Sequence, residues 1–137
     1  MPNRIAIVGS RAYSRLDLVE AFVAALPVGT IVVSGGARGV DTVAEIVARD
    51  RGLEVIVFQA DWDRLGRKAG PIRNAQIVAN ADRVVAFWDG KSRGTLNTLL
   101  QADAAALPVE VFDSEGQPVP VDQWREAAAR VGGRAGT

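Results

Sequence analysis

The chain has 137 residues, which is the length of one domain with a single sizeable core. Sixteen basic and sixteen acidic residues cancel, so no overall electrostatic field draws the protein to nucleic acid or to an anionic membrane, and any anion site must be local. The sequence has neither cysteine nor histidine, which excludes thiol nucleophiles, disulfides, zinc sites built on these residues and a histidine general base; we expect no metal and no cofactor.

Short apolar runs alternate along the chain with longer segments of helical period. The predicted strands, whose nearly continuous valine and isoleucine content is typical of strands buried on both faces, cover residues 4–8, 30–34, 54–58, 83–87 and 109–112. The predicted helices between them cover about residues 16–26, 40–48, 71–80 and 95–106. Strands alternating with helices predict an α/β fold of three layers, with a mainly parallel five-stranded sheet connected by right-handed crossovers.

The pattern changes after the fifth predicted strand. Residues 113–116 are typical of a turn, and Pro118 and Pro120 restrict the following segment to an edge strand or an extended conformation. A final helix follows this short extension. We find no linker and no repeat, so we expect residues 1–131 to form one domain and residues 132–137 to be a disordered tail.

Met1 leads directly into an apolar strand, without the basic, apolar and small-residue regions of a secretory signal. No apolar run approaches the length of a membrane span. We therefore expect a cytoplasmic protein that does not associate with membranes.

Three loops that follow predicted strands each combine glycine, a hydroxyl group and arginine. They are Gly9-Ser10-Arg11, residues 34–41 (SGGARGVD) and residues 88–95 (WDGKSRGT). In an open parallel sheet, ligands bind beyond the carboxyl ends of the strands, where the strand order reverses. Glycine lets the backbone approach a ligand closely, helix N-termini present free N–H groups, and arginine offers two parallel hydrogen bonds to a phosphate. Together the loops predict an anion-binding cradle.

Each of these residues also has a purely structural interpretation. The glycines could form tight turns, Asp41 and Thr95 could cap helices, and the arginines could be solvated. Trp88 and Trp62 could pack in the core, although a tryptophan directly after a buried strand could stack on a base. The coincidence of one composition in three loops favours a binding site over three independent turns.

The polar segment from Asp61 to Asn74 carries four cations, namely Arg64, Arg67, Lys68 and Arg73. It is either an exposed loop or part of the site. Arg73 falls in the first turn of the third predicted helix, and if that turn faces the crevice the guanidinium points at the same anion.

In sequence order, GSR after the first strand, SGGARGVD after the second, ADW with AGPIRN, and RGT after the fourth strand resemble the SLOG superfamily, in its YspA-like branch. The resemblance covers residues 4 to about 112. It implies a Rossmann-like fold, a nucleotide or nucleotide-derived ligand and a homodimer.

Two further likenesses widen the functional possibilities. SGGARGVD and PIRN are similar to segments of the DNA-processing protein A family, whose members bind single-stranded DNA. RGT is similar to the end of the PGGxGTxxE signature of LOG-type phosphoribohydrolases, which cleave the N-glycosidic bond of nucleoside monophosphates. However, Thr98 stands where that signature has its glutamate, so LOG-type hydrolysis would need Asp41 or Asp89 as a substitute carboxylate.

Three functional hypotheses remain open. The first, which we favour, is a binding or sensing module for a nucleotide. The second is a nucleotide N-glycosidic-bond hydrolase, with Asp41 or Asp89 as the catalytic candidate. The third, a single-stranded DNA-binding protein, is disfavoured by the neutral charge balance. The ligand-binding residues that we predict are Gly9, Ser10, Arg11, Ser34, Gly35, Gly36, Arg38, Gly39, Asp41, Arg73, Asn74, Trp88, Gly94 and Thr95.

Overall fold

The centre of the computed structural model, which describes residues 3–135, is one six-stranded sheet in the order β3-β2-β1-β4-β5-β6. The strands are β1 (Arg4–Gly9), β2 (Ile31–Ser34), β3 (Glu54–Val57), β4 (Arg83–Phe87), β5 (Val109–Phe112) and β6 (Pro118–Val119). The first five are parallel, as predicted, and β6 adds an antiparallel edge strand to β5. Because Pro118 has no N–H to donate to a further strand, its place at the edge agrees with the predicted restriction.

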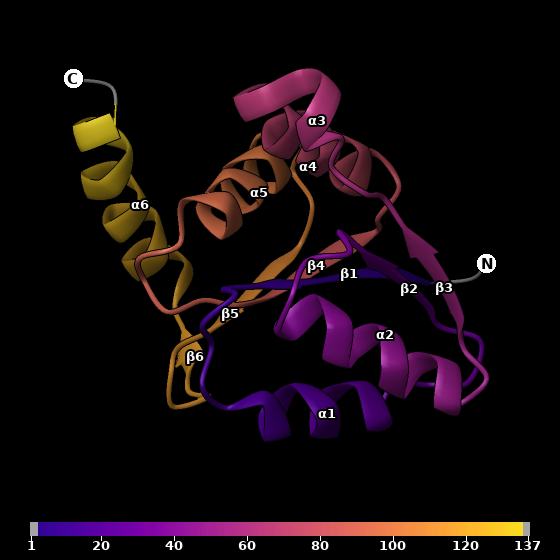
Figure 1. The fold of residues 1–137 in the computed structure, drawn as a ribbon. Coiled ribbons are helices and arrows are strands. Elements are labelled where there is room, and N and C mark those ends of the chain that lie inside the picture. The colour runs from indigo at the N-terminus through magenta and orange to yellow at the C-terminus, as the bar shows by residue number, and fades with distance from the viewer. Residues whose placement is uncertain (1–2, 136–137) are drawn as a thin grey trace.

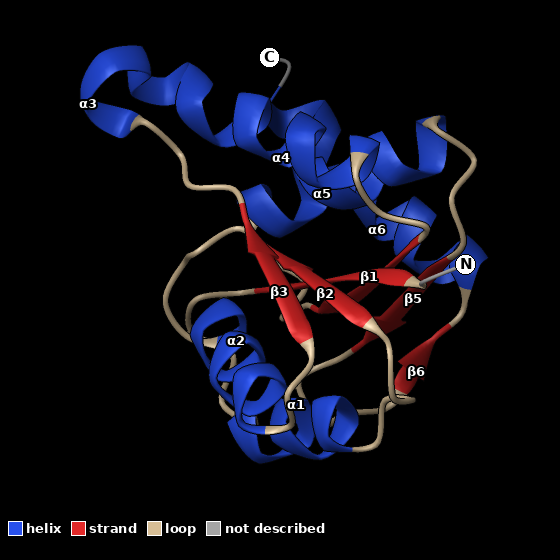
Figure 2. Ribbon diagram, turned by 90° about the vertical axis from the view of Figure 1, so that its right-hand side faces the viewer, coloured by secondary structure: helices blue, strands red, loops and turns tan. Residues whose placement is uncertain are grey.

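The helices form two layers, one on each face of the sheet (Figure 1, Figure 2). They are α1 (Leu16–Ala24), α2 (Val40–Asp50), α3 (Trp62–Leu65), the 3-10 turn η1 (Gly66–Lys68), α4 (Ala69–Ala79), α5 (Arg93–Ala104) and α6 (Val121–Ala135). Figure 2 shows α1 and α2 below the sheet and α3 to α6 above it. This arrangement is the predicted three-layer, Rossmann-like α/β fold.

Alternation of side chains along β1 divides the apolar residues between two cores. Ile5 and Ile7 pack on the side of α1 and α2, whereas Ala6 and Val8 pack on the side of α4, α5 and α6. All four are buried. Successive side chains of a strand point to opposite faces, so a strand covered on both faces must be apolar at every position.

The strand order reverses between β1 and β4. From β1 the chain moves outward through β2 to β3, and β4 then returns to the other side of β1 and continues to β5. The loops that follow β1 and β4 consequently diverge at their carboxyl ends, which opens a crevice between them.

Several boundaries differ from the predictions. The third predicted helix, α4, begins at Ala69 rather than Pro71, because the first-turn N–H groups have no partner within the helix and proline is tolerated there. The polar segment before it contains α3 and η1 rather than a loop only. Residues 132–135, assigned to the tail by sequence, continue α6, and residues 136–137 lie outside the described part. Within residues 3–135, no helix has the length and apolar content needed to cross a membrane.

Candidate functional site

A cavity of about 600 Å³ lies at the carboxyl ends of β1 and β4, between the loop after β1 and the N-terminal parts of α4 and α5. Its lining includes these predicted site residues: Gly9, Ser10, Arg11, Asp41, Arg73, Asn74, Gly94 and Thr95. The second carboxylate candidate, Asp89, lines it as well. The structure therefore brings together residues from all three glycine-rich loops and from α4.

A second, smaller cavity of about 310 Å³ lies beside the loop that joins β2 to α2. Gly35, Gly36 and Arg38 line it. Arg11 and Arg73 line both cavities. For brevity we call the larger one the first cavity and the smaller one the second cavity.

Three residues of the predicted site line neither cavity. Ser34 is buried, and its hydroxyl donates to Oε2 of Glu45 at 2.6 Å. Gly39 precedes α2 with a φ of 78°, and a Cβ there would lie 2.7 Å from the carbonyl oxygen of Arg11, so glycine is required by the close approach of two backbones. Trp88 is 4% exposed, and its indole N–H donates to the carbonyl oxygen of Ser92 at 3.0 Å. Burial in the core leaves Trp88 no free face for stacking on a base, which corrects that prediction.

The loop after β1 is fixed against the loop after β4. A Cβ at Gly9 would lie 2.7 Å from the carbonyl oxygen of Phe87, so only glycine fits between the strands and α2. The amide of the buried Ser10 donates to the same oxygen at 3.0 Å, and its hydroxyl accepts from the amide of Asp89 at 3.1 Å. The predicted GSR loop therefore has a demonstrable role in holding the two edges of the crevice together.

One carboxylate oxygen of Asp89 takes part in the turn that follows β4. Its Oδ1 accepts from the amides of Lys91 and Ser92, each at 2.9 Å. Burial alone would raise the pKa of Asp89, but these hydrogen bonds outweigh it and hold the pKa below its ordinary value. The carboxylate is thus a weak base committed to the loop.

The N-terminus of α5 faces the first cavity. Ser92 caps the helix and accepts from the amide of Thr95 at 3.3 Å, so Thr95 has a structural role as well as a place in the cavity lining. A Cβ at Gly94 would meet no atom within 4 Å, which leaves open space beside the first turn. The positive end of the helix dipole is therefore accessible to an anion.

Arg73 is the centre of a network that connects α4, α5 and the loop after β2. Its Nη1 donates to the carbonyl oxygen of Gly35 at 2.6 Å, and its Nε donates to Oδ1 of Asn74 at 2.8 Å. The buried Asn74 in turn donates through Nδ2 to Oδ1 of Asn97 at 3.0 Å and to the carbonyl oxygen of Gly94 at 3.2 Å. These contacts fix the orientation of the guanidinium group. Burial lowers the pKa of Arg73, but an arginine remains protonated at any physiological pH.

Asp41 lies in the first turn of α2, near enough to Arg73 to feel its charge. Its Oδ2 accepts from the amide of Ala37 at 3.2 Å. Burial raises the pKa of this carboxyl to about 6, against the opposing effects of the Ala37 amide and the Arg73 charge. Asp41 combines the two interpretations drawn from sequence, because it holds the turn before its own helix and also lines the first cavity.

The sequence reasoning missed several cavity residues. Trp62 lines both cavities, is 49% exposed, and lies against Gly70, where a Cβ would come 3.1 Å from the indole. Its place in the polar segment, five residues beyond the end of β3, was a usable signal. Asn97 and Gln59 line the first and second cavity respectively, and neither belongs to a recognisable pattern.

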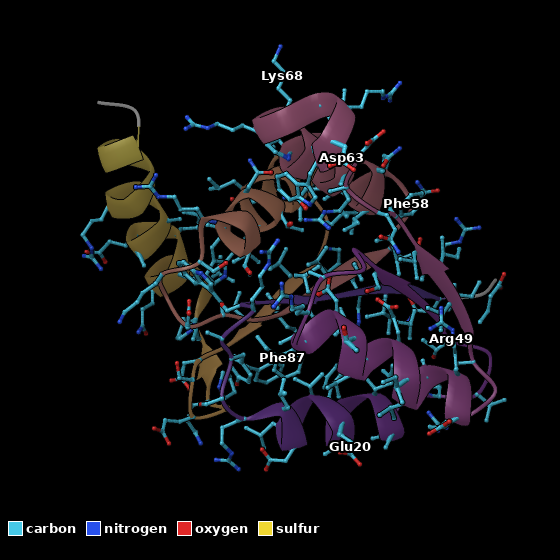
Figure 3. All side chains as sticks on the ribbon, in the orientation of Figure 1. Glu20, Arg49, Phe58, Asp63, Lys68 and Phe87 are labelled. Atoms are coloured by element: carbon cyan, nitrogen blue, oxygen red, sulfur yellow. The ribbon has the colours of Figure 1, made fainter. Side chains whose placement is uncertain are left out.

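The remaining cations of the polar segment lie away from both cavities. Arg64 is exposed and pairs with Asp61, which caps α3. Figure 3 shows Lys68 extending outward from the helical segment, away from the sheet. Within residues 3–135, no group of three or more carboxylates, histidines or cysteines is placed to hold a metal ion.

The sequence is similar to one family of proteins and to one phage protein. The model of the YspA, cpYpsA-related SLOG family matches residues 3–65. The gene 61 protein of Mycobacterium phage D29 is 40% identical over 120 residues, and the match covers 80% of this chain and 96% of the phage protein.

Two solved structures share the fold. DNA processing protein A from Streptococcus pneumoniae superposes with a TM-score of 0.72 at 22% identity, over 97% of this chain and 56% of that one. DNA processing protein A from Helicobacter pylori, which binds single-stranded DNA, superposes with a TM-score of 0.60 at 19% identity, over 96% of this chain and 73% of that one. The chain thus spans little more than half of the Streptococcus protein. On the family match and the phage relative, the protein belongs to the YspA-related family of the SLOG superfamily.

Proposed function

We propose that this protein binds a nucleotide or nucleotide-derived ligand in the first cavity and acts as a binding or sensing module. The observation that supports this most is the convergence of Arg11, Arg73 and the N-terminus of α5 on one cavity of about 600 Å³. That volume lies within the range of roughly 300–1,000 Å³ typical of small-molecule sites.

Arg73 supplies the main phosphate contact in this proposal. Two of its nitrogens are held by Gly35 and Asn74, and no residue within 3–135 accepts a hydrogen bond from the third, Nη2. Because the guanidinium is already oriented, little conformational entropy is lost when it binds an anion. Arg11 is exposed at the same edge and adds a second positive charge.

The apolar part of the first cavity suits a base or another flat ring. Val8, Pro71 and Ile77 contribute apolar lining, and the indole of Trp62 lies at the rim. An aromatic ring beside an aliphatic wall is a common environment for stacking. The lining of the cavity therefore combines charged and apolar side chains, as a nucleotide requires.

The chemistry of the carboxylates supports binding rather than hydrolysis. Thr98 lines the cavity where the LOG signature has glutamate, and its hydroxyl donates to the carbonyl oxygen of Gly94 at 3.3 Å. Asp89 is committed to its turn. Asp41 lines the cavity as the other candidate to assist cleavage of an N-glycosidic bond, but its Oδ2 accepts from the amide of Ala37 and so holds the turn before α2.

Calorimetric titration with adenosine monophosphate tests the proposal. Arg11→Ala should weaken binding by roughly tenfold or more, the loss expected for a hydrogen bond to a charged group, and it should leave the fold intact because Arg11 is exposed. Arg130→Ala, which changes an exposed arginine on α6, is the matched control and should bind like the parent. Failure of mono- and dinucleotides alike to bind, together with a purified protein that retains no small molecule by mass spectrometry, would refute nucleotide binding.

Single-stranded DNA binding is the second candidate, supported by the structural similarity to DNA processing protein A from Helicobacter pylori. Arg11, Arg38, Arg73 and Arg93 gather at one edge and form a local positive patch on a neutral protein. A patch this small should give weak binding at physiological salt. Submicromolar affinity for an oligonucleotide, falling steeply and linearly on a log–log salt plot, would favour DNA over a free nucleotide.

A further inference from the structure

The second cavity is not explained by a mononucleotide in the first. It lies beyond Arg73 on the side of β3 and is lined by Gly36, Arg38 and Gln59. The side chains of Gln59 and Arg38 are both exposed, so the side-chain amide of Gln59 and the guanidinium of Arg38 are accessible to a ligand. The cavity is therefore small and polar, with accessible donors and acceptors.

The two cavities meet at a charged junction. Arg11, Ala37, Trp62 and Arg73 line both of them. Arg73 lies close enough to Arg11 for the positive charge of Arg11 to lower the pKa of Arg73. Two like charges held together without a ligand repel each other, and an anionic group between them would remove that repulsion.

Glycine keeps the second cavity open. Gly36 has a φ of 69°, which side chains other than glycine rarely adopt, and a Cβ there would lie 3.3 Å from Cδ of Gln59. The backbone thus comes close beneath the Gln59 amide, and a larger residue would displace it. The conformation of the turn after β2 therefore leaves room for the second cavity, besides leading the chain into α2.

We propose that the ligand consists of two nucleoside-like groups joined through phosphate, with the phosphate at the Arg11–Arg73 junction, one group in the first cavity and the other in the second. This inference rests on the proposed function and adds the class of ligand. One ring system occupies the apolar part of the first cavity. The other, or its ribose, meets the polar groups of Gln59 and Arg38.

Two sources could supply such a ligand. A free dinucleotide and two successive residues of a DNA strand both place phosphate between two nucleosides. We commit to the free dinucleotide because the two cavities adjoin at one sheet edge, and because the net charge of the protein is zero. A strand would need further cations along its path.

The experiment compares three adenine probes by calorimetry: adenosine monophosphate, a 5′–5′ pyrophosphate-linked diadenosine and a single-stranded deoxyadenosine oligomer. The pyrophosphate-linked probe should bind at least tenfold more tightly than the monophosphate. Gln59→Ala should bring that ratio close to one, and Gln76→Ala, which changes an exposed glutamine on α4 outside both cavities, should leave it unchanged.

Three results would overturn the inference. Equal affinity for the monophosphate and the pyrophosphate-linked probe would show that the second cavity takes no part, while the proposed function would survive. Tighter, strongly salt-dependent binding of the oligomer would assign the cavities to a DNA strand. If no probe binds and the purified protein retains no small molecule by mass spectrometry, the inference and the proposed function both fail, so the two failures are distinguishable.

Discussion

Replacing Asp41 with asparagine should stabilise the folded protein at neutral pH and remove a pH dependence of stability. Burial raises the pKa of Asp41 to about 6, whereas an unfolded aspartate has a pKa of about 3.9. Between those values the folded state keeps a proton that the unfolded state has lost. The free energy of unfolding therefore falls as pH rises, and the accumulated loss above pH 6 is roughly 3 kcal/mol, from about 1.4 kcal/mol per pKa unit.

Asparagine has the shape of a protonated aspartate and can still accept the amide hydrogen of Ala37. Urea denaturation at pH 5, 6 and 7 measures the effect through the transition midpoint. Glu20→Gln, which changes an exposed carboxylate on α1 (Figure 3), is the control and should follow the parent. Parallel pH profiles for the parent and Asp41→Asn, or a less stable variant at pH 7, would refute the reasoning.

Four further outcomes follow from the site. Gly94→Leu should lower monophosphate affinity at least tenfold without lowering the urea midpoint, because a side chain there enters open space; a lost fold would contradict this. Incubation with adenosine monophosphate should release no adenine above the uncatalysed background by chromatography, and release abolished by Asp41→Asn would establish an enzyme instead. Arg38→Ala and Arg73→Ala should be non-additive by about 0.5 kcal/mol or more in a double-mutant cycle with the pyrophosphate-linked probe, since both line the second cavity; strict additivity would separate them. Affinity for that probe, which does not titrate near neutrality, should rise from pH 8 to pH 6, because an anion near Asp41 raises its pKa further; a flat profile would exclude the coupling.

The sheet could be predicted because its signal is local. The central strands are buried on both faces and must be apolar throughout, so each appears as a continuous run in the sequence. The meeting of the three glycine-rich loops at one edge could be predicted as well, since parallel strands bring their carboxyl ends to one edge whatever their order. The family match and the structural likeness agree with that interpretation of the fold.

The tryptophan that lines the cavities could not be identified from the sequence in the same way. Trp88 directly follows β4, and Trp62 lies five residues beyond the end of β3, but the packing decides which indole is covered. Phe87 and Trp88 are consecutive and enter opposite cores, and the indole of Trp88 is then covered by the layer that holds α5. Trp62 is the first residue of α3, a short helix within the polar segment that is capped by Asp61. Which indole is free depends on how helices far apart in sequence cover the sheet.

The hydrogen-bond network around Arg73 and Asn74 could not be predicted from the sequence either. Asn97 matters because α4 and α5 pack side by side and place it against Asn74. Nothing in the spacing of asparagines along one helix indicates a partner on another. Ser34 shows the opposite error, because a hydroxyl in a glycine-rich loop was assigned to ligand binding and instead donates to Glu45 within the fold.

The unfavourable free energy of burying Asp41 and Arg73 at the sheet edge supports a ligand-binding role. A buried Asp41 with a raised pKa destabilises the fold at neutral pH, and a half-buried Arg73 beside Arg11 adds desolvation and repulsion. Apolar residues of similar volume would be no worse for stability, as replacements of buried ion pairs show. An anion bound at the junction would become the partner of Arg73, and Asp41 could then take up a proton and lose its own desolvation penalty. Groups that are costly in the empty protein would thereby become favourable in the complex, and ligand binding would be coupled to proton uptake at this edge.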